Sequence, residues 1–345
     1  MRTAKPALET WKRLVLRAMP LPAWLSPDAP QCDVVLSTRV RVMRNLAGHR
    51  FPHLAPSDER LAVLKEVLAA TRGIGMDLEV NKSITNAERE YMVGARLISP
   101  DFAYQDPSAA VLLNEDRSLS LMVNEEDHLR IQALVGGWSL ETARLLALRA
   151  EKGLASQLHF ARLEDRGYLA ASPFNCGAGV RHSCMLHLIG LASAKRLPNI
   201  LKALGEKNLV ARGPFGESSR AIGAFVQISS TSGDAVEFAG AVEYLIQEER
   251  IARINAHADK VAGPAQKAIT LAQTSRTLTL ADCLRVLGWV RWACIEGMVG
   301  LQPRQVDAFL SSMDIHASIS DKGPEQARAD ALRGFLDMAS IPVLS

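Results

Sequence analysis

The sequence predicts an α+β protein, with an antiparallel sheet flanked by helices and a smaller all-helical region after it. Strand patterns come in hairpins, as at Ala110 to Leu113 and Ser118 to Val123 around the polar turn Asn114 to Arg117, and hairpins favour an antiparallel sheet. From Asp234 onward only helical periodicity remains. The 345 residues are 48% hydrophobic and 22% charged, a composition typical of a globular enzyme.

The N-terminal third begins with a segment, residues 1–33, that holds a predicted helix from Leu8 to Met19 and a proline-rich connector. Val34 to Val42 then predicts a strand. Within it Arg39 and Arg41 lie two residues apart, so their side chains share one face. A helix follows, for which Ser57 is the expected N-cap.

The middle of the chain continues the strand pattern. Leucines and valine at 119, 121 and 123 alternate with smaller or polar residues, which predicts a half-buried strand. Tyr168 to Ala171 predicts another short strand. A glycine-containing loop, Pro173 to Gly179, follows it and leads into a helix expected to begin near Arg181.

Two further strands are predicted at Leu209 to Arg212 and Ala224 to Ser229. The segment between them, Gly213 to Ser219, is rich enough in small residues to form a lid. We expect a boundary near residue 254, so that a mixed domain covers residues 34–254 and a helical domain covers residues 255–345.

The overall charge and the cysteine pattern exclude several classes of protein. The net charge is only +3, from 40 basic and 37 acidic residues, and this gives no case for nucleic-acid binding. The five cysteines include no Cys-x-x-Cys pair, which indicates a reducing compartment and argues against a zinc site. With no signal-peptide pattern and charges inside the most apolar stretch, we expect a soluble, cytoplasmic protein without membrane contacts.

Neither of the common phosphate-binding signatures is present. The chain has no G-x-x-x-x-G-K-[ST] motif and no protein-kinase set of glycine loop, catalytic Asp and D-F-G. A bound nucleotide would therefore need arginines to neutralise its phosphates. Five arginines at loop or strand-end positions are candidates: Arg39, Arg41, Arg130, Arg181 and Arg212.

Each of these arginines also has an ordinary interpretation as a solvated surface residue. Arg130 could form an exposed helical ion pair with Glu126, four residues earlier. Arg181 is harder to explain in this way, because a cation at a helix start opposes the helix dipole and so suggests an anionic partner. The residue pattern alone leaves both interpretations open.

Two acidic elements complete the candidate site. Glu125, Glu126 and Asp127 directly follow a predicted strand, and Glu217 lies in the candidate lid. Adjacent carboxylates repel one another unless they are solvated or face a cation. They form either a charged turn or a pocket for a guanidinium, whose planar donors suit bidentate carboxylates.

Several motifs in order carry a resemblance to a known family. The blocks are Leu36 to Arg41 with Arg44-Asn45-Leu46, Phe51-Pro52, Leu97 to Pro100, Val123 to Ile131, Asn175 to Arg181 with Met185 to Leu188, and Arg212 to Glu217 followed by Gln227 to Ser229. The chain resembles the ATP:guanido phosphotransferases, or phosphagen kinases, and among them the bacterial protein arginine kinases. The resemblance covers roughly residues 34–230, a span of ordinary domain size.

The resemblance implies an activity and a set of site residues. Glu126 and Glu217 would hold and polarise the guanidinium that accepts the γ-phosphate of ATP, and Mg²⁺ would be carried by the nucleotide, with no protein metal site. Arg96 stands where relatives often have a nucleotide-contacting histidine. The implied nucleotide-binding residues are Ser37, Thr38, Arg39, Val40, Arg41, Arg96, Arg130, Arg181, His182, Ser183, Cys184, Met185, Arg212, Gly213, Pro214, Phe215, Gly216 and Glu217.

The resemblance also implies partners. Arginine-containing proteins are the expected substrates, because only a short segment precedes Val34 where free-guanidino kinases carry a helical domain. An activator protein, Clp-type protease machinery and a homodimer are further expectations. The alternatives are a kinase for a small free guanidino compound, or an inactive adaptor that binds nucleotide or phosphoarginine. The string from Gln326 to Ala331 departs from the phosphoarginine-reading motif of relatives.

Overall fold

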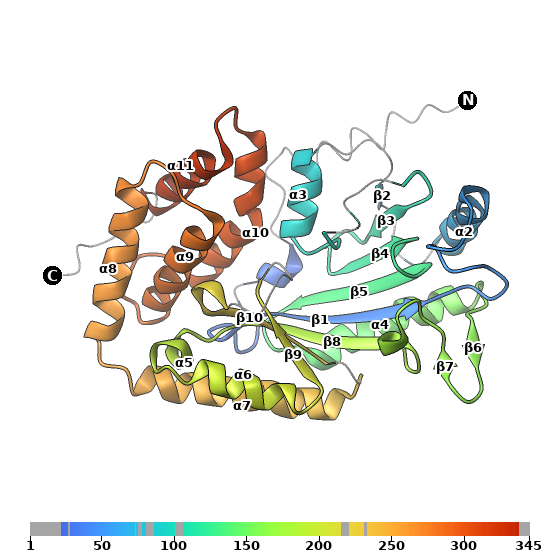
Figure 1. Ribbon diagram of the computed structural model, residues 1–345, viewed down its shortest axis with the longest axis horizontal. Helices are drawn as coiled ribbons and strands as arrows, with labels where there is room; N and C mark the ends of the chain where they lie inside the picture. Colours follow the sequence, from blue (N-terminus) through green and yellow to red (C-terminus); the bar gives the residue numbers. More distant parts are fainter. Residues whose placement is uncertain are drawn as a thin grey trace.

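The computed structural model describes residues 22–26, 28–72, 74, 78–80, 86–100, 102, 106–214, 221–230 and 233–337. The predicted helix from Leu8 to Met19 and residues 215–219 of the candidate lid lie outside these ranges. Within them the predicted fold class is confirmed: an antiparallel sheet is flanked by helices, and a group of helices follows at its C-terminal end (Figure 1).

Among the described residues, eight antiparallel strands form one sheet in the order β2-β3-β4-β5-β1-β8-β10-β9. They are β1 (Val35–Arg44), β2 (Leu78–Val80), β3 (Ala110–Leu113), β4 (Leu119–Val123), β5 (Leu129–Gly136), β8 (Val180–His187), β9 (Leu209–Arg212) and β10 (Phe225–Ser230). A separate pair joins β6 (Arg162–Leu163) to β7 (Gly167–Tyr168). The strand predicted from Tyr168 to Ala171 is therefore mostly loop.

Strand β1 shows why the two faces of the sheet differ. Val40 and Val42 are fully buried in the main core, under α4 (Leu140–Ala155) and α7 (Ala235–Ile254). Because side chains alternate along a strand, Arg39 and Arg41 lie on the opposite face. Helix α7 begins where predicted, with the Asp234 carboxylate accepting hydrogen bonds from two amides of the first turn.

The hairpin β3–β4 is buried on both faces, so the prediction of a half-buried strand was wrong. Helix α2 (Ser57–Ala70) covers one face, where Val67 packs in the same core as Leu121. Helix α3 (Asn86–Gly94) and the loop after it cover the other face, where Leu97 packs in a small core with Met122. The cap position of α2 is Pro56, not the predicted Ser57.

The prediction of a helix beginning near Arg181 was also wrong, because this residue lies in β8. Arg181 pairs with Arg41 of β1, and Ser183 pairs with both Arg39 and Ser229 of β10. Hydrogen bonding to strands on both sides outweighs any local preference for a helix, so the helix-dipole argument for an anion at Arg181 no longer applies. Arg181 instead faces the same side of the sheet as Arg39 and Arg41.

The remaining helices form two groups. Helices α5 (Ile189–Ser193) and α6 (Leu197–Gly205) lie beside α7, and helices α8 (Asp259–Thr274), α9 (Leu280–Ile295), α10 (Pro303–Ile319) and α11 (Pro324–Asp337) gather at one end of the sheet (Figure 1). The second group shares a core with Leu36, Met185 and Phe225 of the sheet. The division at residue 254 stays a prediction. None of the described helices combines the length and the apolar character that crossing a bilayer requires.

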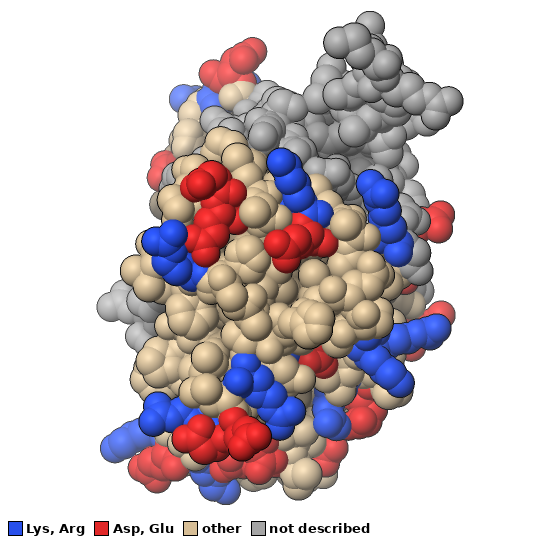
Figure 2. All heavy atoms as spheres, turned by 90° about the vertical axis from the view of Figure 1, so that its right-hand side faces the viewer, with Lys and Arg blue, Asp and Glu red and all other residues tan. Residues whose placement is uncertain are grey.

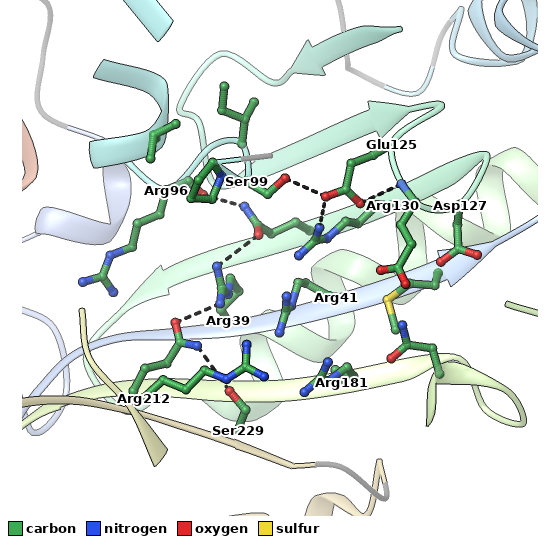
Figure 3. Close-up of a pocket in the computed structure, with 18 of the residues that line it drawn as sticks. Arg39, Arg41, Arg96, Ser99, Glu125, Asp127, Arg130, Arg181, Arg212 and Ser229 are labelled. Atoms are coloured by element: carbon green, nitrogen blue, oxygen red, sulfur yellow. Dashed lines mark hydrogen bonds and ion pairs between the residues drawn. The ribbon is translucent and has the colours of Figure 1, made fainter. Parts of the chain in front are cut away.

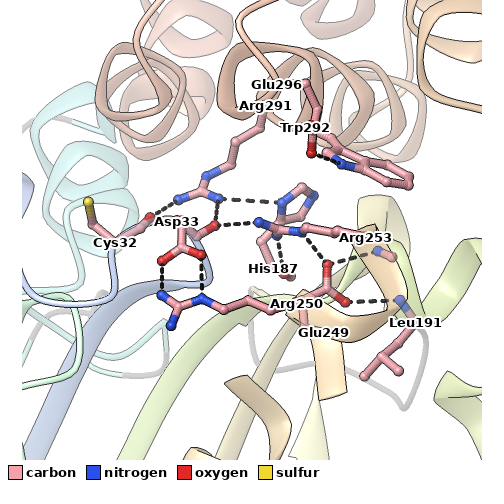
Figure 4. A network of polar contacts seen from close by, with 11 residues as sticks. Cys32, Asp33, His187, Leu191, Glu249, Arg250, Arg253, Arg291, Trp292 and Glu296 are labelled. Carbon is pink, nitrogen blue, oxygen red and sulfur yellow. Dashed lines mark hydrogen bonds and ion pairs between the residues drawn. The ribbon is translucent and has the colours of Figure 1, made fainter. Parts of the chain in front are cut away.

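Buried charges tie these C-terminal helices to the sheet (Figure 4). Arg291 of α9 is fully buried, and its Nε donates to Asp307 Oδ1 of α10 at 2.7 Å. Arg291 and Arg253 of α7 both donate to the backbone carbonyl of Asp33, at 2.9 and 3.1 Å. Arg253 also donates to the carbonyl of His187 at the end of β8. The ends of β1 and β8 are thus fixed relative to three helices.

The end of the molecule that carries α2 and the β6–β7 pair presents charges of both signs. Figure 2 shows Lys and Arg side chains next to Asp and Glu side chains over the described residues of this face. Arg50 with Glu59 is one such pair, with Nε and Oε2 2.8 Å apart. This face therefore lacks the single-signed basic field that typically binds a nucleic-acid backbone.

Candidate active site

A cavity of about 660 Å³ opens on the face of the sheet opposite α4 and α7. Its walls come from β1, β5, β8, β9 and β10, from the turn between β4 and β5, and from the loop after α3. This volume is within the usual range for small-molecule sites. Six arginines line the cavity: Arg39, Arg41, Arg96, Arg130, Arg181 and Arg212.

The sheet brings together all five arginines that the sequence singled out. Figure 3 shows the side chains of Arg39, Arg41, Arg130, Arg181 and Arg212 grouped around one space. They come from four different strands, and Arg41 stands directly opposite Arg181 in the β1–β8 pairing. Like charges at directly opposed positions destabilise a sheet. Such a cluster therefore indicates a binding function, because it does not help the fold.

The cluster holds more arginines than nearby carboxylates, and an ion pair is formed by Arg130, with Glu125. Burial lowers the pKa of Arg39 to about 9, and the neighbouring charges of Arg130, Arg96 and Arg181 contribute. The pKa values of Arg41 and Arg181 are also lowered, mainly by burial and in addition by the charges of neighbouring arginines. The buried Nε atoms of Arg41 and Arg181 have no hydrogen-bond partner within the described residues. An oxyanion that accepts from these donors would relieve both the repulsion and the unmet hydrogen bonds.

The three carboxylates of the β4–β5 turn have different partners. Glu125 is turned toward Arg130, with which it forms an ion pair, and it accepts a hydrogen bond from Ser99 Oγ at 2.6 Å. Burial alone would raise the pKa of Glu125, but the charge of Arg130 and these hydrogen bonds lower it. Arg130 lies in β5, so the alternative of a helical ion pair with Glu126 is wrong.

Asp127 is a buried residue at the wall of the cavity, and its hydrogen bonds hold the turn in place. Its Oδ1 accepts from Asn45 Nδ2 at 2.6 Å and from the backbone amide of Ala171 at 2.7 Å. Asn45 Oδ1 in turn accepts from the amide of His128 at 2.9 Å. Burial lowers the pKa of His128 to about 4, so the ring is neutral and can accept from Leu46 N through Nδ1.

Glu126 is the carboxylate of this turn that remains available to a ligand in the cavity. Its side chain lines the cavity, partly covered by protein and partly open to solvent, and none of the described residues donates a hydrogen bond to its carboxylate. Burial raises the pKa of Glu126, as do the charges of Asp127 and Glu125, while Arg130 and Arg181 partly oppose the shift. A carboxylate with a raised pKa, set across from arginines, can bind a cationic group and accept its proton.

Removal of Asn45 tests whether this turn is held as described. Asn45→Ala leaves the buried His128 amide without its acceptor and leaves the Asp127 carboxylate with the Ala171 amide but one donor fewer. An unpaired buried group costs about 1–3 kcal/mol, and a lost hydrogen bond to a charged group costs about as much. We expect the free energy of unfolding to fall by about 2–4 kcal/mol in urea titrations. A change below about 0.5 kcal/mol would show that the network does not hold the turn. Asn255→Ala, at an exposed helix end, serves as the control.

The other predicted site residues are placed less uniformly. Pro214 and Arg96 line the cavity. Val40 and Cys184 belong to the main core on the far face, and His182 stacks on Phe238 of α7 there. Several predicted residues do not line the cavity: Ser37, Thr38, Val40, His182, Ser183, Cys184, Met185 and Gly213. Phe215, Gly216 and Glu217 lie outside the described residues, and the part expected of Glu217 stays a prediction.

Several lining residues were not singled out from the sequence as site residues. Gln132, Gln227 and Ser229 face the cavity. The sequence held a signal for each of them. Gln132 lies two residues after Arg130 on the same strand and therefore on the same face, and Gln227 and Ser229 belong to the last of the quoted motif blocks. Leu280, at the start of α9, also lines the cavity, and no local pattern marks it.

Comparison with known proteins identifies what the chain is similar to. The family model of the ATP:guanido phosphotransferase C-terminal catalytic domain matches residues 63–250. A protein-arginine kinase of Pelotomaculum thermopropionicum is 35% identical over 286 residues, which cover 78% of this chain and 80% of that protein. A protein-arginine kinase of Shouchella clausii is 38% identical over 243 residues, 67% of this chain and 68% of that protein.

A solved structure has the same fold. The duplicated taurocyamine kinase of Schistosoma mansoni, with bound transition-state-analogue components, superposes with a TM-score of 0.58. The match covers 71% of this chain and 38% of that chain, at 22% sequence identity. At this identity the likeness concerns the fold.

Proposed function

From the premise that this chain belongs to the ATP:guanido phosphotransferase family, we propose that it is a protein-arginine kinase. It transfers the γ-phosphate of ATP to the guanidinium of arginine residues in proteins. The observation that carries the proposal is the arrangement of one cavity, in which a cluster of six arginines lies across from the carboxylate of Glu126. The arginines suit a polyphosphate, and the carboxylate suits a guanidinium.

ATP fits the arginine group by charge and by hydrogen-bonding capacity. The unpartnered Nε donors of Arg41 and Arg181 and the lowered pKa values of the buried arginines both favour an anion. Mg²⁺ bound to the nucleotide would neutralise further phosphate charge. The family resemblance implies that the nucleotide oxygens are its ligands, and oxygen is the ligand atom that Mg²⁺ prefers.

The transfer step needs alignment more than covalent chemistry. The acceptor arginine is protonated in solution, with a pKa above about 12. Glu126 orients its guanidinium and takes up one N–H proton as a guanidinium nitrogen forms the new N–P bond. The bond between the γ-phosphorus and the bridging oxygen breaks, and its electron pair stays on ADP. Arg39, Arg41 and Arg181 stabilise the charge that develops there.

The names of both relatives support an arginine within a protein as the acceptor. We further expect, from the resemblance alone, an activator protein, Clp-type protease partners and a homodimer. The cysteine pattern supports a cytoplasmic location. Catalysis also involves Glu217 in this proposal, by its place in the family motif.

The activity can be tested by incubating the protein with ATP and an arginine-rich protein. We expect acid-labile phosphoarginine in mass spectra of the acceptor. A matched acceptor in which lysine replaces the modified arginines should gain no phosphate, because the guanidinium is the nucleophile. Phosphorylation of free arginine but not of the protein would contradict the proposed acceptor. ADP binding without transfer to either acceptor would indicate an adaptor.

A further inference from the structure

Arg39 differs from the other arginines of the cavity in how its side chain is held. Three side chains accept hydrogen bonds from its guanidinium, and each comes from a different strand. Nε donates to Ser183 Oγ of β8 at 3.1 Å, Nη2 donates to Gln227 Oε1 of β10 at 2.9 Å, and Nη1 approaches Gln132 Oε1 of β5 at 3.5 Å. All three acceptors are uncharged.

The two glutamine amides are themselves oriented by other groups. Gln132 Nε2 donates to the backbone carbonyl of Arg96 at 2.6 Å and to Ser120 Oγ at 3.2 Å. A carbonyl accepts only from the NH₂ end of the amide, so Gln132 Oε1 must face Arg39. For Gln227 the orientation follows from Arg39 itself, because a guanidinium only donates and therefore requires the amide oxygen; Nε2 then donates to Ser229 Oγ at 3.3 Å.

Gln227 is also next to two of the arginines that line the cavity, Arg39 and Arg212. It is the direct cross-strand partner of Arg212 in the β9–β10 pairing, and its amide oxygen reaches Arg39. Any charge at position 227 would therefore act on both guanidiniums at close range. In contrast, Arg130 is held by a carboxylate, that of Glu125.

We propose that Gln227 is a positioning residue that holds Arg39 in place without neutralising it, so that the full charge of Arg39 acts on the nucleotide phosphates. A carboxylate would make the same hydrogen bond but would repel the phosphates. The proposal rests on the proposed function, because it assumes a nucleotide in this cavity. It gives a reason for an amide at this position: the guanidinium of Arg39 must be held in one orientation and must also keep its full positive charge.

Two substitutions separate charge from hydrogen bonding. Gln227→Glu is nearly isosteric and keeps an acceptor for Arg39 but adds a negative charge. Gln227→Met removes the acceptor and stays neutral. We expect the Kd for ADP, from isothermal titration calorimetry, to rise at least about tenfold for Gln227→Glu, since a tenfold change is only about 1.4 kcal/mol and a charge at close range is worth more. We expect a smaller rise for Gln227→Met, with a larger loss in kcat than in ADP affinity.

The order of the two variants decides the matter. If Gln227 acts only through packing and its hydrogen bond to Arg39, its lack of charge is irrelevant. Gln227→Glu should then bind ADP at least as well as Gln227→Met, and that result would overturn the proposal. Gln247→Glu, the same substitution at an exposed position of α7, controls for net charge and should match the wild type. A wild-type protein that binds no ADP would refute the proposed function instead. Thermal unfolding of both Gln227 variants confirms that they are folded.

Discussion

Replacing Glu126 by glutamine is expected to lower kcat for phosphoarginine formation by about 10²- to 10⁴-fold, the range that a positioned general base contributes. Glutamine keeps the size of the side chain but cannot accept the guanidinium proton or pair with its charge. The Kd for ADP should change less than about threefold, because the arginines that face the phosphates are untouched. Single-turnover phosphoryl transfer and ADP calorimetry measure the two effects separately.

The same variant has an expected effect on stability. Burial and two neighbouring carboxylates raise the pKa of Glu126. A carboxyl whose pKa is raised by folding is less stable when ionised, so its contribution to stability is lost as pH rises through that pKa. At neutral pH, Glu126→Gln removes this cost and should leave Tm unchanged or higher. Glu243→Gln, on the exposed side of α7, is the matched control.

A Glu126→Gln variant that kept more than about a tenth of the wild-type kcat would contradict the assignment of Glu126 as base. The turn geometry explains why its neighbours are not expected to replace it. Glu125 is committed to Arg130 and Ser99, and Asp127 is committed to Asn45 and the Ala171 amide.

Replacing Arg41 by glutamine is expected to have opposite effects on catalysis and on stability. We expect kcat/KM for ATP to fall by about 10³-fold, because a buried arginine that faces transferred phosphate contributes effects of this order. We also expect the free energy of unfolding to rise. Arg41 is buried beside Arg39, Arg130 and Arg181, and its Nε has no partner among the described residues, so its charge opposes folding.

Urea unfolding and steady-state kinetics with varied ATP test both halves of this prediction. Arg149→Gln, at an exposed position of α4, controls for the loss of one positive charge. A variant that lost stability and activity together would show that Arg41 is a structural residue. A variant that gains stability and loses activity is typical of a site in which function is maintained at the expense of stability.

Local sequence patterns predicted those helices and strands whose conformation depends mainly on residues close together in the chain. The strand that carries Arg39 and Arg41 has period-two alternation, and this places both arginines on one face whatever the neighbouring strands are. The β3–β4 hairpin has its turn residues between two apolar runs, and α7 begins at a capping Asp234. The five arginines and Glu126 were also identified in the sequence.

Local patterns failed where a residue's environment depends on strands distant in the chain. Arg181 follows a glycine-containing loop, which suggested a helix start, but pairing with β1 on one side and β10 on the other makes it a strand residue. The alternation of β4 suggested one exposed face, but α3 covers that face. The helix expected near Arg181 and the half-buried β4 share this cause, since hydrogen bonds and packing between distant segments outweigh local preference.

The sequence by itself determined which side chains could bind phosphate and guanidinium, because arginine and glutamate carry those capacities wherever they stand. Tertiary structure decided how each is used. Three consecutive carboxylates look alike in the sequence, but Arg130 takes one and Asn45 takes another, leaving Glu126 free for the cavity. Gln227 likewise reaches Arg39 only because β8 lies between β1 and β10 in the sheet, which brings the two side chains within hydrogen-bonding distance. The reason is that charge belongs to a residue, whereas neighbours and distances belong to the fold.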